Sequence, residues 1–410
     1  MEEEFPAFSL AERDRRWGAA RRILEARGMD CLLVFGNDRF PISTYFSNDR
    51  IDMIVVLPQR GEPIGLGWST QLVAEHLEST RRGEAVWMED VRHGARAQHI
   101  VATLKELVCE RSRIGVLGLK SAGVLQSEGI VPYTTWQGIL EGLSQAQFED
   151  AWEAFRTFVL IKSEEELRVL RTSAEAGEAA CAALLETARP GVNEAKLYAA
   201  AMEAVLSRGV RMVWLIIQSG PACSSWGPPM WLFRPQPSRV IQRGDIINAE
   251  VFPEYGMLET QQQMCIAVGE IHPVNQRCAE IARRSYEIGL EALKPGARFG
   301  DLVAAMEAPI REVGGWNLTP MIHVINPLDF AGSVGIGIEK NLPGIERYKN
   351  VRGRPTLEPE VEIRAGMAFA FEPNCHIGTH RINIGGTVVA TEKGPVELNT
   401  LANHMQHVPA

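Results

Sequence analysis

The chain has 410 residues, of which 45% are hydrophobic and 23% charged, and its formal net charge is −9. These values are typical of a globular protein that buries a large core, and the length suggests two or three domains. The acidic balance argues against a nucleic-acid-binding protein, because phosphate backbones favour clustered Lys and Arg. The sequence has no apolar run of about 18 residues, the length needed to span a membrane.

The N-terminus and the cysteines indicate the compartment. Met1-Glu2-Glu3-Glu4 lacks the basic and apolar regions of a signal peptide, so we expect a cytoplasmic protein. The seven cysteines are odd in number and include no CxxC pair. In a reducing compartment such cysteines are free thiols, and their spacing indicates no zinc site.

The first part of the chain alternates helical and strand-like patterns. Residues 8–28 predict a helix that Ser9 caps and Gly28 ends. Further helical patterns cover residues 70–80 and 94–110. Short apolar runs that predict buried strands are Cys31–Phe35, Ile51–Leu57 and Ile114–Gly118. This alternation predicts an α/β layer domain over residues 1–155.

Long helical patterns, Gln145–Phe158 and Glu164–Thr187, mark the predicted hinge between two domains. The second domain, residues 156–410, again mixes helices and strands. Its helical patterns cover residues 274–293 and 300–314. Its predicted strands are Met212–Gln218, Ile246–Phe252, Gln263–Val268, Met367–Glu372 and Gly386–Thr391.

Several segments of the second domain resemble the creatinase/aminopeptidase P family, and they occur in the order that the family shows. The segments are Ile161-Lys162-Ser163-Glu164-Glu165-Glu166-Leu167, Arg189-Pro190-Gly191-Val192-Asn193-Glu194, Gly244-Asp245-Ile246-Ile247-Asn248, Leu293-Lys294-Pro295-Gly296-Ala297 and Arg364–Pro373. The resemblance implies a fold of the α/β (α+β) class. An N-terminal creatinase-like α/β domain would be followed by a C-terminal "pita-bread" domain with a curved, pseudo-symmetric antiparallel sheet.

The resemblance also implies a small-molecule substrate and a homodimer. Family members carry the active site in the C-terminal domain, with residues of the partner's N-terminal domain at its rim. On this basis we expect no nucleic-acid or membrane partner, and a site near the subunit interface.

Most metal ligands of the family are missing from this sequence. Metal-dependent members hold two divalent ions with two aspartates, a histidine and two glutamates. These positions fall on Glu250, near Thr260, and on Val334, Glu372 and Asn383. Two carboxylates do not make a tight two-ion site, so we expect no metal and no other cofactor. A single divalent ion held by Glu250, Glu372 and His323 remains an alternative.

Creatinase provides a metal-free precedent within the family. It uses a histidine as acid and base and two glutamates to hold a guanidinium group. One of those glutamates matches Glu372 and the other matches Gln262, whereas residues 220–243 contain no histidine to match the third group. We therefore expect Glu250 and Glu372 to hold a cation. The candidate proton carriers are His323, His376 and His380.

The remaining candidates are predicted to bind the substrate. Glu259 belongs to the predicted acid-rich cleft, together with Glu250 and Glu372. Arg381 lies a few residues after Glu372 in the chain. Trp226 would form a wall for a cation. Arg50 lies near the position where creatinase receives a carboxylate-binding arginine from its partner subunit, and Arg suits bidentate binding of carboxylates.

Three functions are compatible with these patterns. The leading hypothesis is a metal-independent hydrolase that cleaves a C–N bond of a small amine- or amidine-bearing carboxylic acid. The second is a mononuclear-metal Xaa-Pro-type aminopeptidase or lyase. The third is a binding module of the same fold that has lost catalysis.

Overall fold

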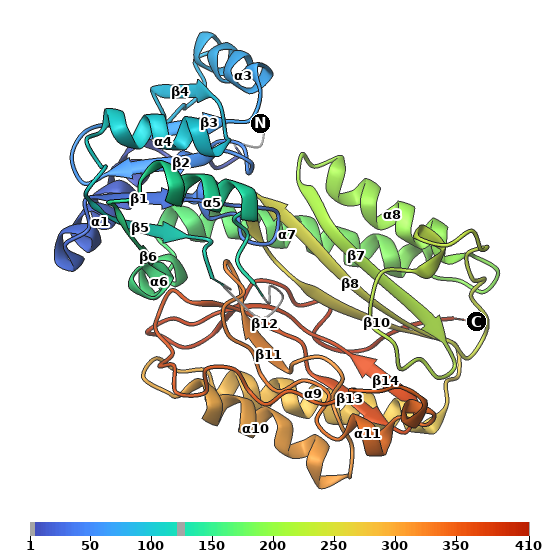
Figure 1. Ribbon diagram of the computed structural model, residues 1–410. Helices are drawn as coiled ribbons and strands as arrows, with labels where there is room; N and C mark the ends of the chain where they lie inside the picture. The colour runs from blue at the N-terminus through green and yellow to red at the C-terminus, as the bar shows by residue number, and fades with distance from the viewer. Residues whose placement is uncertain (1–4, 121–127, 410) are drawn as a thin grey trace. The chain divides into compact units, whose positions relative to one another are not determined.

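The computed structural model describes residues 5–120 and 128–409, which form two compact units that meet between Leu160 and Ile161. Each unit has its own sheets and helices (Figure 1). Among the described residues, no helix is both long and apolar enough to cross a membrane.

The first unit is built on a six-stranded mixed sheet in the order β4-β3-β2-β1-β5-β6. Strand β1 runs parallel to β5 and antiparallel to β2. The strands are β1 Cys31–Val34, β2 Ile54–Pro58, β3 Ile64–Gly67, β4 Asp90–His93, β5 Arg113–Leu117 and β6 Gln147–Asp150. The helices are α1 Leu10–Arg27, α2 Ile42–Ser47, α3 Thr70–Arg81, α4 Ala97–Glu106, α5 Tyr133–Gly142 and α6 Trp152–Leu160.

Local chemistry explains the ends of α1. The Ser9 side chain accepts a hydrogen bond from the Glu12 amide, and Gly28 ends the helix with a left-handed φ of 63°.

The helical pattern predicted over Gln145–Phe158 is corrected, because its first half is the edge strand β6 and only Trp152–Leu160 is helical. Gln147, Glu149 and Asp150 are polar and only Phe148 is apolar, so this segment has no apolar run that would indicate a buried strand.

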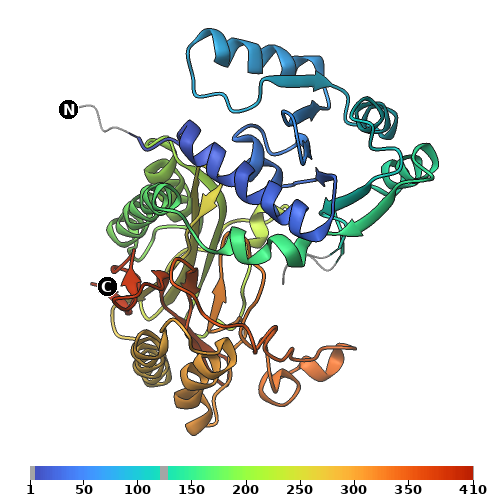
Figure 2. The same ribbon diagram turned by 90° about the vertical axis from the view of Figure 1, so that its left-hand side faces the viewer.

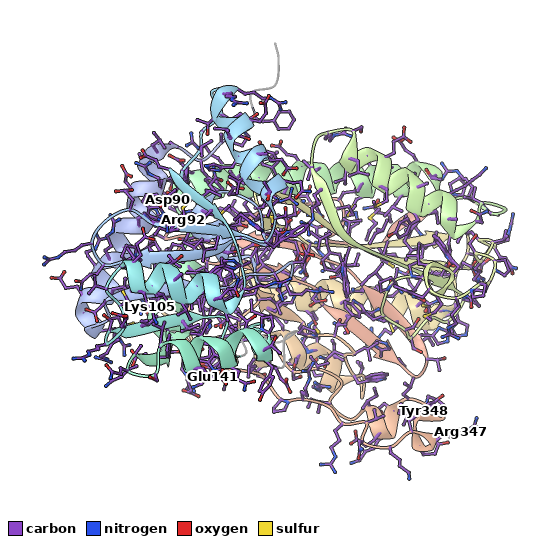
Figure 3. All side chains as sticks on the ribbon, turned by 45° about the horizontal axis from the view of Figure 1, so that its top comes forward. Asp90, Arg92, Lys105, Glu141, Arg347 and Tyr348 are labelled. Atoms are coloured by element: carbon purple, nitrogen blue, oxygen red, sulfur yellow. The ribbon has the colours of Figure 1, made fainter. Side chains whose placement is uncertain are left out.

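The other edge of this sheet is strongly charged. On β4, Arg92 pairs with Asp90 at 2.5 Å and with Glu106 of α4 at 2.6 Å (Figure 3). Charged side chains on an edge strand disfavour pairing with a strand of another molecule.

The second unit contains three sheets among the described residues. The largest has the order β17-β10-β8-β7, with β9 paired to β8; a second has the order β11-β12-β15-β16; the third is the hairpin β13-β14. The strands are β7 Arg211–Gly220, β8 Ile246–Tyr255, β9 Leu258–Glu259, β10 Gln262–Val268, β11 Ile322–Val324, β12 Ala368–Phe371, β13 Asn374–Ile377, β14 His380–Asn383, β15 Gly386–Val389, β16 Val396–Glu397 and β17 Gln406–Val408.

Two helix pairs cover these strands from opposite sides (Figures 1 and 2). Helices α7 and α8 pack on β7, β8 and β10, and their buried side chains form one continuous core. Helices α9 and α10 pack together, and α9 contacts the hairpin β13-β14. The helices are α7 Glu164–Thr187, α8 Glu194–Leu206, α9 Pro273–Ala292, α10 Phe299–Glu312 and α11 Ile338–Asn341, with short 3-10 turns η1 Met230–Leu232 and η2 Ile345–Arg347.

Candidate functional site

A histidine and a glutamate meet at the end of two neighbouring strands. Strands β11 and β12 are antiparallel, and Ile322 lies opposite Phe371. His323 lies opposite Ala370, and Glu372 follows Ala370 by two residues, so the two side chains project from the same face. His323 Nε2 lies 3.2 Å from Glu372 Oε1. Both side chains are buried. Burial of both groups strengthens their interaction, because water does not screen it.

Two further contacts orient the His323 ring. Its Nδ1 lies 3.0 Å from the Val324 carbonyl, an acceptor, so Nδ1 carries a proton. Its Nε2 lies 3.1 Å from Gln261 Oε1. Burial acts to lower the pKa of His323, but the hydrogen bond to Glu372 and the charge of Glu372 outweigh it and raise the pKa. The contact with Glu372 thus favours the protonated form of the ring.

Glu250 is the second buried carboxyl group of this cluster. It projects from β8 and accepts hydrogen bonds from Trp226 Nε1 at 2.7 Å and Gln263 Nε2 at 3.0 Å. Burial and the charge of Glu372 raise the pKa of Glu250 to about 8, although the two hydrogen bonds and the charge of Arg381 act in the opposite direction. At neutral pH this carboxyl group is therefore mostly protonated.

The glutamines at the start of β10 and just before it, Gln261, Gln262 and Gln263, point alternately to opposite faces. Gln263 lies opposite Glu250 across the β8-β10 ladder, and Gln261 contacts His323. Gln262 points the other way, where its Nε2 donates to Thr260 Oγ1 at 3.0 Å and to Asn399 Oδ1 at 2.8 Å. Gln262 therefore faces away from His323, since successive side chains of a strand face opposite sides, and its predicted role in substrate binding stays a prediction. Thr260 faces the same outer side as Gln262. The side chain nearest to the metal-ligand position that was predicted near Thr260 is therefore that of Gln261.

Glu259 lies at the margin of the cluster. Its Oε1 accepts a hydrogen bond of 2.7 Å from Gln261 Nε2. It thereby fixes the amide of Gln261 so that the oxygen faces His323. The structure thus links Glu259 to the buried pair through Gln261.

The hairpin β13-β14 adds a histidine and an arginine. His376 and Arg381 lie opposite each other in the hairpin, and both are fully buried. Arg381 Nη1 donates to the Ser225 carbonyl at 2.9 Å, and Nη2 lies 3.4 Å from Thr319 Oγ1. Burial lowers the pKa of Arg381, whereas the charges of Glu250 and Glu372 act to raise it. Burial and the charge of Arg381 hold the pKa of His376 well below its usual value.

His380 faces away from this cluster. It lies next to Arg381 on β14, so its ring projects from the opposite side, toward α9. There it stacks on His272 at 4.5 Å between ring centroids, and its Nδ1 lies 2.9 Å from Asn275 Oδ1. His380 is therefore removed from the candidate proton carriers.

Arg50 belongs to the first unit and forms ion pairs there. Its Nη1 lies 2.8 Å from Glu75 Oε2, and its Nε lies 3.6 Å from Asp52 Oδ1. About half of its side chain is exposed. Its predicted role in substrate binding stays a prediction.

The sequence places the family histidine at Val334, and this placement stays a prediction. Val334 pairs through its backbone with Arg354, in the part of the unit that leads to α11 and to the exposed Arg347 and Tyr348 (Figure 3). The histidine that contacts Glu372 is His323.

The side chains of the cluster do not fit a two-ion centre. Besides Glu250 and Glu372, the cluster offers one imidazole, that of His323, and the neutral amides of Gln261 and Gln263. An amide binds hard cations less strongly than a carboxylate does. Among residues 5–120 and 128–409, no group of three or more His, Cys, Asp or Glu is arranged to hold a metal ion.

Three residues of the cluster were not predicted from the sequence: Gln261, Gln263 and Trp316. For the two glutamines the strand alternation was an available signal, because Glu250 and its cross-strand neighbour face the same side. Trp316 stacks on His376 at 4.2 Å between ring centroids. Nothing in its sequence context indicated this contact, which depends on a backbone bridge between distant segments.

Comparison with known proteins shows the family. Residues 168–392 match the model of metallopeptidase family M24. The chain belongs to metallopeptidase family M24. Among its relatives, methionine aminopeptidase A of Synechocystis is 27% identical over 227 residues, which cover 54% of this chain and 82% of that protein. Creatinase of a Bacillus species is 27% identical over 182 residues, 42% of this chain and 43% of the relative.

Solved structures of this family share the whole fold. Dipeptidase PepE of Mycobacterium ulcerans has a TM-score of 0.73 at 19% identity, covering 98% of this chain and 100% of the other. The X-Pro aminopeptidase of Thermotoga maritima has a TM-score of 0.74 at 18% identity, covering 96% and 99%. The predicted two-domain, pita-bread α/β fold is confirmed. The chain is a member of a hydrolase family whose enzymes cleave C–N bonds and normally use divalent metals.

Proposed function

We propose that this M24 protein hydrolyses a C–N bond of a small amine- or amidine-bearing molecule without a catalytic metal ion. The observation that carries the proposal is the buried contact of 3.2 Å between His323 Nε2 and Glu372 Oε1. A carboxylate that orients an imidazole is a common arrangement for general acid–base catalysis. The neighbouring amides supply hydrogen bonds where metal-dependent relatives need charged ligands.

The reaction divides between these two groups. The Glu372 carboxylate accepts a proton from the attacking water, and the resulting hydroxide adds to the carbon of the scissile bond. The His323 imidazolium donates its Nε2 proton to the leaving nitrogen as the C–N bond breaks. The proton on Glu372 then returns to His323 across their contact, so that one water is consumed and both groups are restored.

Glu250 has the properties of a binding group for the cationic end of the substrate. Without a cation its carboxyl group is mostly protonated, because burial raises its pKa to about 8. An amidinium or ammonium group beside it would favour the carboxylate form. Substrate binding near neutral pH should therefore release a proton from Glu250.

A substrate screen in the presence of excess chelator tests the proposal. The screen contains amidino acids such as creatine, Xaa-Pro dipeptides and methionyl peptides, and each compound is assayed for release of the C–N cleavage product. We expect turnover that survives the chelator and is lost in Glu372→Gln and in His323→Asn. Turnover that requires an added divalent ion would instead support a metal-dependent peptidase. Ligand binding without any turnover would support a binding module.

A further inference from the structure

Two thiols of the first unit lie in contact with each other. Cys31 is the first residue of β1, and Cys109 lies in the connection from α4 to β5. Both belong to the same buried core of this unit, and both are free thiols. Their side chains are hydrogen-bonded to each other. Two sulfurs in hydrogen-bond contact need only a small rearrangement to form a disulfide bond.

Cys109 lies directly beneath the surface, whereas Cys31 lies in the interior. The residues on both sides of Cys109, Val108 and Glu110, are exposed, and Cys109 itself is 4% exposed. Cys31 is 0% exposed. A small oxidant therefore reaches Cys109 first, and Cys31 is placed to react second.

The backbone next to Cys109 is strained. Val108 has a φ of 59°, a left-handed conformation that β-branched residues rarely adopt. The chain turns back here at the end of α4, so that the Cys109 amide donates to the Leu104 carbonyl at 2.9 Å. Glycine is the usual residue at such a helix end. The turn holds Cys109 in the core beside Cys31, and strained backbone is concentrated at functional sites.

The contact makes Cys109 the more reactive thiol of the two. The hydrogen bond from Cys31 lowers the pKa of Cys109 against the opposing effect of burial, and a hydrogen bond with Ser112 acts in the same direction as Cys31. The same contact, together with burial, raises the pKa of Cys31. Since the thiolate is the form that reacts with oxidants, Cys109 is the attacking member of the pair. In contrast, burial raises the pKa of the thiols of Cys181 and Cys265.

We propose that Cys31 and Cys109 form a redox-sensitive pair that a hydroperoxide converts into a disulfide bond. The Cys109 thiolate attacks one oxygen of hydrogen peroxide, the O–O bond breaks, hydroxide leaves and Cys109 becomes a sulfenic acid. The Cys31 thiol then attacks this sulfur, and the S–O bond breaks with loss of water. In total two thiols and one peroxide give one disulfide and two waters, because the two sulfurs lose the two electrons that the peroxide gains. This chemistry is confined to the first unit and does not depend on the proposed hydrolysis.

Peptide mapping of the full-length protein after brief exposure to hydrogen peroxide tests the pair. The remaining thiols are blocked with N-ethylmaleimide, and linked peptides are identified by mass spectrometry with and without dithiothreitol. We expect a linkage between Cys31 and Cys109 that dithiothreitol reverses.

A second thiol pair of the same chain is the matched control. Cys278 and Cys375 are also hydrogen-bonded to each other, but both are 0% exposed. The contact with Cys278 and burial raise the pKa of Cys375. This pair should therefore be oxidised about tenfold more slowly than Cys31 and Cys109, or less.

Three variants separate the roles of the thiols. In Cys31→Ser, Cys109 should accumulate as a sulfenic acid that dimedone labels, because no second thiol follows. In Cys109→Ser, Cys31 should stay a free thiol under the same conditions. Cys181→Ala changes a buried thiol elsewhere and should form the Cys31–Cys109 bond at the wild-type rate. The bond constrains the unfolded chain, so oxidation should raise the melting temperature of the wild type by about 5 °C or more.

Any of three results would overturn the proposal. They are the absence of a Cys31–Cys109 linkage in the oxidised wild type, linkage of Cys278 with Cys375 at an equal rate, and failure of dimedone to label Cys109 in Cys31→Ser. If the serine variants do not fold, the wild type decides the question by the order in which iodoacetamide modifies its thiols. The proposal requires that Cys109 reacts before Cys181, and the reverse order would contradict it.

Discussion

His323 Nε2 lies 3.2 Å from Glu372 Oε1, and both side chains are buried at the end of the antiparallel pair β11-β12. The hydrogen bond to Glu372 and its charge raise the pKa of His323 against the opposing effect of burial. The contact depends on strand pairing between segments almost fifty residues apart, so that each group is oriented before any ligand arrives.

Replacement of His323 by Asn should abolish most of the activity. Asn keeps a hydrogen-bonding group of similar position but cannot transfer a proton, so we expect kcat to fall by about 100- to 10,000-fold. The measurement is kcat on any substrate that the chelator-treated wild type cleaves. His380→Asn is the control and should keep wild-type kcat, because that ring stacks on His272 at the other face of the hairpin. Equal losses in the two variants would speak against His323 as the proton carrier.

The stability of the protein should fall as the pH rises through the titration range of Glu250. Its pKa is raised from 4.5 to about 8 in the folded protein, so the folded state holds a proton that the unfolded state releases. Stability from this group is complete below pH 4.5 and is lost between about pH 4.5 and 8, by up to about 5 kcal/mol. Urea unfolding of the wild type and Glu250→Gln at several pH values measures the difference.

In Glu250→Gln the neutral side chain does not titrate. The wild type should therefore lose stability relative to this variant as the pH is raised from 5 to 8. A constant difference between the two proteins over that range would mean that Glu250 is ionised in the folded state, and the proposed cation-binding role would lose its electrostatic basis.

Gly177→Ala should destabilise the protein although Ala favours helices. In an ordinary helix interior this change stabilises by about 1 kcal/mol. At Gly177, however, an added Cβ would lie 2.0 Å from Gln262 Oε1, and Gln262 is fully buried and held by Thr260 and Asn399. We expect a net loss of about 1–2 kcal/mol in urea unfolding, because overpacking a close contact outweighs the helical gain.

The same pair offers a reciprocal control. In a Gln262→Ala background the contact is absent, so Gly177→Ala should become neutral or stabilising. If Gly177→Ala costs the same in both backgrounds, Gln262 does not face α7, and its assignment to the outer face of β10 would be wrong.

Elements with strong local signals were predictable from the sequence. The capping box of Ser163 and Glu166 marks the start of α7, and the predicted range Glu164–Thr187 is the helix observed. The buried runs of β1, β5, β8 and β10 were recognised for a similar reason, because an apolar segment bounded by turn residues indicates a strand. The polar edge strand β6 and the short strands β11, β13 and β14 gave no such signal.

The site was less predictable because its geometry depends on register. A shift of one residue along a strand moves a side chain to the other face, and this separates Gln262 from Gln261 and Gln263. The same alternation separates His380 from Arg381 on β14. Glu250 and Glu372 were placed in the cluster because their motifs are local. His323 was not distinguished from His376 and His380, since its contact with Glu372 arises from the pairing of β11 with β12.

The most direct test of metal-independent chemistry is elemental analysis of protein purified without chelator, combined with kcat before and after dialysis against excess chelator. The account predicts transition-metal content far below one ion per chain and an unchanged kcat. One or two tightly bound divalent ions per chain, with activity that disappears on chelation and returns with the ion, would contradict it.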